Sequence, residues 1–74
     1  MKISNHAVDR YRERFNPFIA AETCRSFLKR CLANSEKLDR NHTYHRSYGD
    51  YYLNTEYNII FAVRQNTATT VYPT

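Results

Sequence analysis

The sequence predicts an α+β fold in which two N-terminal helices pack on a four-stranded antiparallel sheet. In the first half of the chain, apolar residues recur at intervals of three and four, which is typical of amphipathic helices. The second half is rich in Tyr, Thr, Ile and Val, with six of the seven tyrosines between positions 44 and 72, and this composition is typical of strands. With 74 residues, the chain should form a single domain, residues 1–74, with a thin core.

The first helix is expected to begin near His6 and to end near Asn16 and Pro17. Ser4 or Asn5 can cap its N-terminus, because their side-chain oxygens accept hydrogen bonds from the unpaired amides of the first turn. The residue before a proline avoids helical dihedrals, which sets the end of the helix. The apolar positions repeat at helical spacing on one side, at Val8, Tyr11 and Phe15.

The second helix is expected over residues 19–33, with Asn34 and Ser35 as its stop. Its apolar stripe consists of Ala20, Cys24, Phe27, Leu28, Cys31 and Leu32. On one helix the two cysteines would lie about 10 Å apart along the axis, which is too far for a disulfide. Both cysteines are therefore expected to be thiols in the core.

Four strands are expected in a meander, at residues 37–40, 42–53, 57–64 and 68–72. In the third strand, one set of alternate residues should pack under the helices: Tyr57, Ile59, Phe61 and Val63. The opposite face then carries Asn58, Ile60, Ala62 and Arg64.

The register of the last hairpin depends on its loop. A two-residue loop at Asn66 and Thr67 would set Thr70 opposite Val63, whereas a three-residue loop would set Val71 there. We favour the second register, because it keeps Val71 in the core and leaves Thr70 and Tyr72 on the open face of the sheet.

The net charge is +4, and the excess lies in the first half: residues 1–40 carry nine Lys or Arg against five Asp or Glu, whereas residues 41–74 carry two against two. Eight of the eleven basic residues are arginines, whose planar guanidinium suits phosphate better than a lysine ammonium does. This favours an anionic partner, with nucleic acid as the first candidate. No apolar stretch is long enough to cross a bilayer, and the N-terminus does not resemble a signal peptide, so we expect a cytoplasmic protein with no membrane partner.

Chemically active side chains are concentrated in the first helix. At 100° per residue, His6, Arg10 and Glu13 fall within about 60° of one another, with Arg14 one turn further along. Cleavage of RNA by its own 2′-hydroxyl needs these types: a group that takes the hydroxyl proton, a group that protonates the leaving oxygen, and cations that stabilise charge on the phosphoryl oxygens. No metal is required. The alternative is a solvated helix face in which Glu13 pairs with Arg10 and His6 has no role.

A second polar group lies in residues 41–48, NHTYHRSY. His42 and His45 have opposite parity, so in a regular strand they would point to opposite faces and make a poor metal site. One of these histidines, His42 or His45, could instead face the helix cluster with Tyr44 or Arg46, as a second acid or base or as a phosphate contact. An exposed polar edge strand is an equally good interpretation. The chain has no glycine-rich phosphate loop and no zinc-site spacing, so we expect no cofactor and no metal.

The two ends of the chain resemble a known family. SNHAVDRYRER, residues 4–14, resembles the S-x-H-A-x-x-R-x-x-E-R opening of a family of small bacterial and phage domains, and ATTVY, residues 68–72, resembles the T-x-Y strand that closes them. Those domains are similar to the larger group of barnase, EndoU, colicin nuclease and RelE toxin folds. The resemblance implies a RelE-like domain of two helices on a four-stranded antiparallel sheet.

The resemblance also implies a metal-independent endoribonuclease, often a toxin, that acts on messenger or transfer RNA and leaves a 2′,3′-cyclic phosphate. Carried over by position, His6 would be the acid or base, and Arg10 and Arg14 would stabilise the charge on the phosphate. Thr70 and Tyr72 would line the site from the last strand.

Two functional hypotheses follow. In the first, the protein is a ribonuclease with the catalytic residues His6, Arg10, Arg14, Thr70 and His45 and the substrate-binding residues Arg25, Lys29, Arg46, Arg64 and Tyr72. In the second, it is a catalytically inactive nuclease-like module, of the kind that a phage encodes, that binds nucleic acid or a host protein. RNA is the partner expected first, a protein inhibitor is a further candidate, and a free sheet edge would allow a homodimer.

Overall fold

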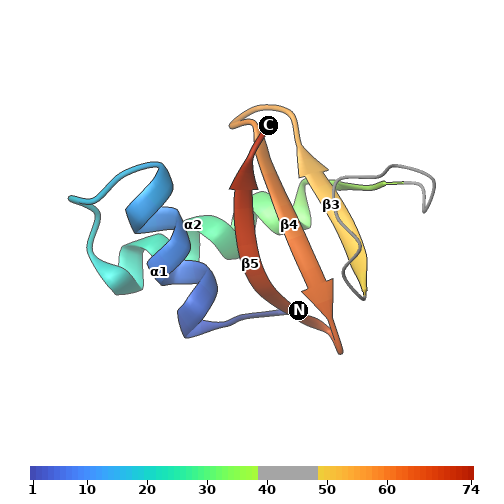
Figure 1. The fold of residues 1–74 in the computed structure, drawn as a ribbon, viewed down its shortest axis with the longest axis horizontal. Helices are drawn as coiled ribbons and strands as arrows, with labels where there is room; N and C mark the ends of the chain where they lie inside the picture. Colours follow the sequence, from blue (N-terminus) through green and yellow to red (C-terminus); the bar gives the residue numbers. More distant parts are fainter. Residues whose placement is uncertain (39–48) are drawn as a thin grey trace.

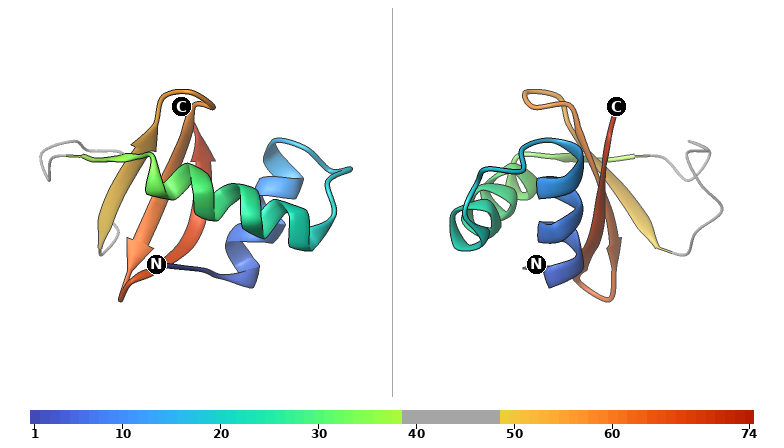
Figure 2. Two further views of the ribbon diagram at one scale, coloured as in Figure 1. Left: turned by 180° about the vertical axis from the view of Figure 1, so that it is seen from behind. Right: turned by 60° about the vertical axis from the view of Figure 1, so that its left-hand side comes forward.

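The computed structural model describes residues 1–38 and 49–74 and shows an α+β fold (Figure 1). Along the chain the elements are β1 (Lys2–Ile3), α1 (Asn5–Arg14), α2 (Ala21–Ala33), β2 (Glu36–Lys37), β3 (Asp50–Asn54), β4 (Ile59–Arg64) and β5 (Thr67–Pro73). The strands form one sheet in the order β1-β5-β4-β3-β2. Both helices lie on one side of this sheet: α2 crosses behind β5 and β4 in Figure 1 and in front of them in the view from behind (Figure 2, left).

The sheet corrects the predicted strand arrangement. The described residues contain five strands, and the sheet is mixed instead of wholly antiparallel. The additional strand is β1, which pairs in parallel with β5 through Lys2 opposite Thr67 and Ile3 opposite Ala68. Two residues are too few to display the alternation by which strands are found in a sequence.

The two strands predicted after the helices are observed in part, since residues 39–48 lie outside the described residues. The strand predicted at residues 37–40 is β2, at Glu36–Lys37. The strand predicted at residues 42–53 is observed as β3, which begins at Asp50. The earlier part of that prediction lies outside the described residues.

Helix α1 begins where the sequence predicts, because the Ser4 hydroxyl caps it by accepting a hydrogen bond from the Ala7 amide at 3.0 Å. Helix α2 begins at Ala21, two residues later than predicted, and has no side-chain cap. Of its predicted stripe, Cys24, Leu28, Cys31 and Leu32 are buried, Phe27 is partly buried, and Ala20 is exposed. Neither described helix is long and apolar enough to cross a membrane.

The core lies between the helices and the sheet. Ile59, Phe61 and Val63 face the helices, as the alternation in β4 predicts, and all three are buried. Tyr57 is 49% exposed, because it lies in the β3–β4 turn and not in the strand. On the opposite face of the sheet Ile60 is fully buried, so that face also excludes water at this position.

The β4–β5 hairpin corrects the predicted register. Val63 lies opposite Ala68, so both registers considered from the sequence are wrong. The loop consists of Gln65 and Asn66, with φ of 51° and 59°. Positive φ at both loop positions is typical of the type I′ turn, whose twist matches that of the flanking strands.

A β-bulge in β5 explains why alternation could not fix the register. The pairing with β4 shifts by one residue, which leaves Thr69 as an additional residue in β5. The bulge reverses the alternation, so Ala68 and Val71 both face the helices and are fully buried. Beyond the bulge, Thr70 and Tyr72 lie on the face of the sheet that points away from the helices, as predicted, and both are half-buried.

The outer edge of β5 is covered by α1. Beyond Ala68, β1 does not continue along β5, and the helix supplies donors to the edge carbonyls instead. The Ser4 hydroxyl donates to the Thr69 carbonyl at 3.1 Å, and Nη1 of Arg14 donates to the Val71 carbonyl at 2.8 Å. Helix α1 therefore runs beside β5 over most of the strand (Figure 1) and blocks an edge that could pair with another chain.

The substitution Ser4→Ala removes both the helix cap and the bond to the bulged strand, so we expect it to lower the free energy of unfolding by about 1–2 kcal/mol. The measurement is urea denaturation followed by circular dichroism. Ser26→Ala, at an exposed position of α2, is the matched control and should change stability by less than about 0.5 kcal/mol. Equal stability of the two variants would contradict the role assigned to Ser4.

Candidate functional site

The side chains predicted to be active on α1 lie along one stripe of the helix. His6, Arg10 and Arg14 are four residues apart, so they follow one another at intervals of about 6 Å along the axis. His6 and Arg14 are exposed, and Arg10 is half-buried. We call these three residues the α1 stripe. It is an elongated, open surface, which suits a chain-like polyanion better than a compact ligand.

Arg10 forms a salt bridge with Glu13. Its Nη1 atom lies 2.7 Å from Oε2 of Glu13, and the two side chains are 34% and 61% exposed. An exposed pair of this kind contributes at most about 1 kcal/mol. The pair is the feature that the solvated-face interpretation expects. It uses one of the five N–H donors of the guanidinium, which leaves Arg10 with the capacity to bind a phosphate oxygen as well.

The structure brings Arg14 and Tyr72 together. The guanidinium carbon of Arg14 lies 5.2 Å from the centre of the Tyr72 ring, while Nη1 of Arg14 donates to the Val71 carbonyl at 2.8 Å. A cation at this distance is attracted by the π-electrons of the ring. Thr70, which is half-buried, lies on the same face of β5 as Tyr72. Arg14 and Tyr72 therefore form one surface, and Thr70 continues that face along the strand.

Arg25 has a structural use that the sequence did not reveal. Its Nη1 donates to the Ile3 carbonyl, and its Nη2 donates to Oδ1 of Asn5. These bonds tie α2 to the junction of β1 and α1. The guanidinium therefore positions the start of the α1 stripe, and its predicted contact with substrate stays a prediction.

The other predicted residues are distributed over the chain. Lys29, on α2, and Arg64, at the end of β4, are exposed. Their contact with substrate stays a prediction. His45 and Arg46 lie outside the described residues.

Arg12 is a residue to which the sequence analysis gave no role. Its Nε atom is buried and has no hydrogen-bond partner in the part of the chain that the structure describes. At 100° per residue, Arg12 falls beside Val8 on the apolar side of α1, so a helical wheel could have singled it out. Its positive charge lowers the pKa of the Cys24 thiol in α2, and this effect is smaller than the rise that burial causes.

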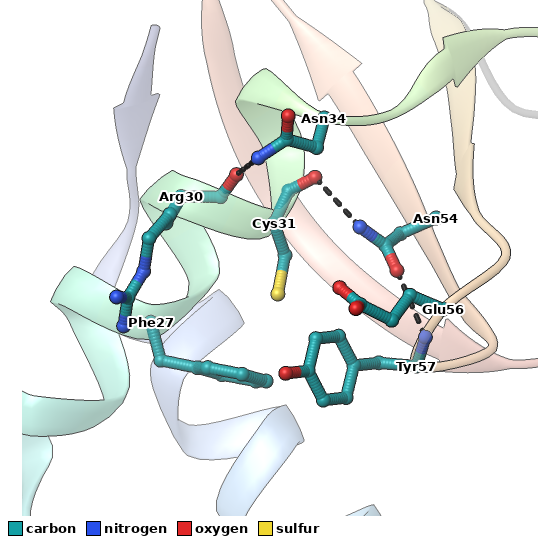
Figure 3. A pocket seen from close by; sticks show the side chains of 7 residues that line it. All are labelled: Phe27, Arg30, Cys31, Asn34, Asn54, Glu56 and Tyr57. Carbon is teal, nitrogen blue, oxygen red and sulfur yellow. Dashed lines mark hydrogen bonds between the residues drawn. The ribbon is translucent and has the colours of Figure 1, made fainter.

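A cavity of about 190 Å³ lies between the C-terminal half of α2 and the β3–β4 turn (Figure 3). Its lining residues are Phe27, Arg30, Cys31, Asn34, Asn54, Glu56 and Tyr57. The sequence analysis missed it, because these residues come from two segments that no short motif connects.

The two cysteines are buried free thiols, as predicted. Burial raises the pKa of both Cys24 and Cys31 above the ordinary value of 9.0, and the Glu56 carboxylate raises the pKa of Cys31 further. A thiol with a raised pKa is protonated at neutral pH and is a weak nucleophile. Neither thiol is therefore a strong nucleophile at neutral pH.

Comparison with known proteins adds no relative to this description. No family model, no curated protein and no solved structure matches the chain. The resemblance of the two ends to ribonuclease-toxin domains stays a prediction, and the function has to be argued from the site.

The free energy of unfolding should hold from pH 7 to near pH 9 and fall at higher pH. Burial raises the pKa of Tyr11 and Tyr51 above 10.0 as well as that of the cysteines above 9.0, so the folded chain keeps these protons to a higher pH than the unfolded chain does. Unfolding then releases protons, and rising pH favours it.

Denaturation curves at a series of pH values test this expectation. A variant with Cys24→Ala and Cys31→Ala should show a smaller fall between pH values of about 9 and 10, and it should keep the fall that the tyrosines cause above that range. A wild-type stability that does not change up to a pH of about 11 would contradict the prediction.

Proposed function

We propose that this protein is a small, metal-independent endoribonuclease of the RelE-toxin type, which cleaves single-stranded, messenger or transfer RNA through the 2′-hydroxyl. One observation carries the proposal: the guanidinium of Arg14 lies 5.2 Å from the Tyr72 ring and continues the stripe of His6 and Arg10. An exposed imidazole, two guanidinium groups and an aromatic ring on one surface are the groups that a ribonuclease of this kind uses.

In the proposed mechanism, His6 takes the proton of the 2′-hydroxyl. The 2′-oxygen then forms a bond to phosphorus, and the bond from phosphorus to the 5′-oxygen breaks, which leaves a 2′,3′-cyclic phosphate. Arg10 and Arg14 stabilise the negative charge that grows on the phosphoryl oxygens. The departing 5′-oxygen needs a proton, and His45 is the candidate donor from the sequence.

The side chains of Arg14 and Arg10 differ in how firmly the protein holds them. Arg14 is held by the Val71 carbonyl and the Tyr72 ring, so its charge is fixed in place before substrate arrives. A preorganised charge stabilises a transition state better than one that must be ordered during the reaction. Among the residues that the structure describes, Glu13 is the partner that holds Arg10, through an exposed pair, and a phosphate can compete with that carboxylate.

A non-catalytic binding module is the second candidate. The Arg10–Glu13 pair favours it, because the pair neutralises part of the charge that catalysis would use. Phe18, which is 94% exposed in the connection between the helices, is also a typical anchor for a protein partner. This candidate keeps the same fold and binds nucleic acid or a host protein without cutting it.

The first test is cleavage of end-labelled single-stranded RNA and transfer RNA in EDTA. Wild type should leave cyclic-phosphate ends, and His6→Ala should reduce the rate by about 100-fold or more. Lys37→Ala is the matched control, since it removes a positive charge from β2 at the opposite edge of the sheet and should cut like wild type. Thermal melts establish that the His6 variant is folded, and intact RNA in every lane would overturn the proposal.

Within the second candidate, salt dependence separates a nucleic-acid partner from a protein partner. If the α1 stripe binds RNA, affinity should fall steeply from about 50 to about 200 mM salt, and Arg10→Ala should reduce the slope of log affinity against log salt by about 0.7. Fluorescence anisotropy of a labelled oligonucleotide measures both quantities. No detectable RNA binding at either salt concentration would leave a protein partner as the remaining interpretation of the second candidate.

A further inference from the structure

The cavity beside α2 has the size and walls of a site for one flat ring system. Its volume is about 190 Å³, and a cavity of about 150 Å³ in another protein holds benzene. Phe27 and Tyr57 form an aromatic wall, with ring centres 4.9 Å apart and planes at 78°. Tyr57 is 49% exposed, so one side of the wall is open to solvent. A ligand can therefore place a ring inside and leave its remaining atoms outside.

The base of the cavity is held in place by hydrogen bonds. Nδ2 of Asn54 donates to the Cys31 carbonyl at 3.0 Å, and Oδ1 of Asn54 accepts from the Tyr57 amide at 2.9 Å. Asn54 is only 2% exposed, so it connects α2 to the β3–β4 turn from within the protein. The Cys31 sulfur points into the cavity between these groups (Figure 3) and provides an apolar, polarisable surface. The cavity is thus preformed and does not depend on a ligand to order it.

Two opposite charges border the cavity. The Arg30 guanidinium reaches its rim from α2, and the Glu56 carboxylate reaches it from the β3–β4 turn. Figure 3 shows them on opposite sides of Cys31 and not paired with each other. A ring bound between them would meet hydrogen-bond donors on one edge and a hydrogen-bond acceptor on the other.

Among the nucleobases, guanine matches this arrangement best. One edge carries two neighbouring donors, N1–H and the N2 amino group, which a carboxylate can accept together. Another edge carries two neighbouring acceptors, O6 and N7, which an arginine binds with both arms of its guanidinium. Adenine sets an acceptor beside its amino group, and uracil sets two carbonyl oxygens beside its single N–H, so both would place a lone pair against a carboxylate.

We propose that this cavity binds an unpaired guanine base of the RNA, with Glu56 accepting from N1–H and N2–H and Arg30 donating to O6 and N7. The inference rests on the proposed function, because it takes RNA to be the substrate and adds a base preference to it. The base must be unpaired, since pairing would occupy the donors that Glu56 needs. The ribose and phosphates stay outside the cavity.

The test is to titrate the full chain with each of the four nucleoside 5′-monophosphates and to measure binding by calorimetry and by amide NMR. GMP should bind about 10-fold or more tightly than AMP and UMP, and the amide signals of Cys31 and Tyr57 should shift on its addition. Glu56→Gln should weaken GMP binding by about 10-fold, whereas Glu36→Gln, which removes the same charge at an exposed position of β2, should change it by less than about 2-fold.

Three results would overturn the inference: no binding of GMP, equal binding of the four nucleotides, or a GMP affinity that Glu56→Gln leaves unchanged. Polyuridylate, which contains no guanine, distinguishes this failure from failure of the proposed function. Cleavage of polyuridylate without a preference for GMP would overturn the guanine site alone. Binding of GMP in the cavity by a protein that cuts no RNA would overturn the ribonuclease and retain the guanine site.

Discussion

The fold depends on how the outer edge of β5 is covered. An open strand edge presents backbone groups that pair readily with another chain, and β1 covers only the first two residues of this strand. Helix α1 covers the rest through donors at both of its ends, the Ser4 hydroxyl and the Arg14 guanidinium, which bind the carbonyls of Thr69 and Val71. These two bonds fix the helix along the strand, and the apolar side of the helix is thereby held over the core.

The same contact joins the architecture to the candidate site. Arg14 is both the residue that closes the edge of β5 and the charge that lies against Tyr72. In the part of the chain that the structure describes, His6 and Arg10 make no hydrogen bond to the sheet. Loss of Arg14 would therefore change stability whatever its part in the proposed site, whereas a change at His6 leaves the contact between α1 and β5 intact. Substitutions of His6 are therefore easier to interpret as tests of the candidate site than substitutions of Arg14.

Much of this could be predicted from the sequence, and the failures have physical causes. The Ser4 cap, the stripe of α2 and the burial of Phe61 follow from local periodicity, which operates within one element. Strand β1 could not be predicted, because its two residues are too few to show alternation. The bulge at Thr69 could not be predicted, because it breaks the alternation from which the strand register is inferred. For the site, spacing alone predicts the α1 stripe and the pair of Arg10 with Glu13, whereas the position of Tyr72 came only from the family resemblance. The cavity around Cys31 depends on contacts between distant segments, which a single sequence does not display.

The Ser4–Thr69 bond joins positions that are 65 residues apart, and it has a consequence for the order of events in folding. During synthesis α1 is made before β5, so this bond cannot form until β5 is complete, although α1 can already pack against α2. Contacts between such distant positions also carry a large loop-closure entropy and are made slowly. The hairpin of β4 and β5, whose loop has two residues, can form from local contacts alone. Its β5 edge is then available for α1 to bind. We therefore expect the bond between Ser4 and Thr69 to form after the β4–β5 hairpin.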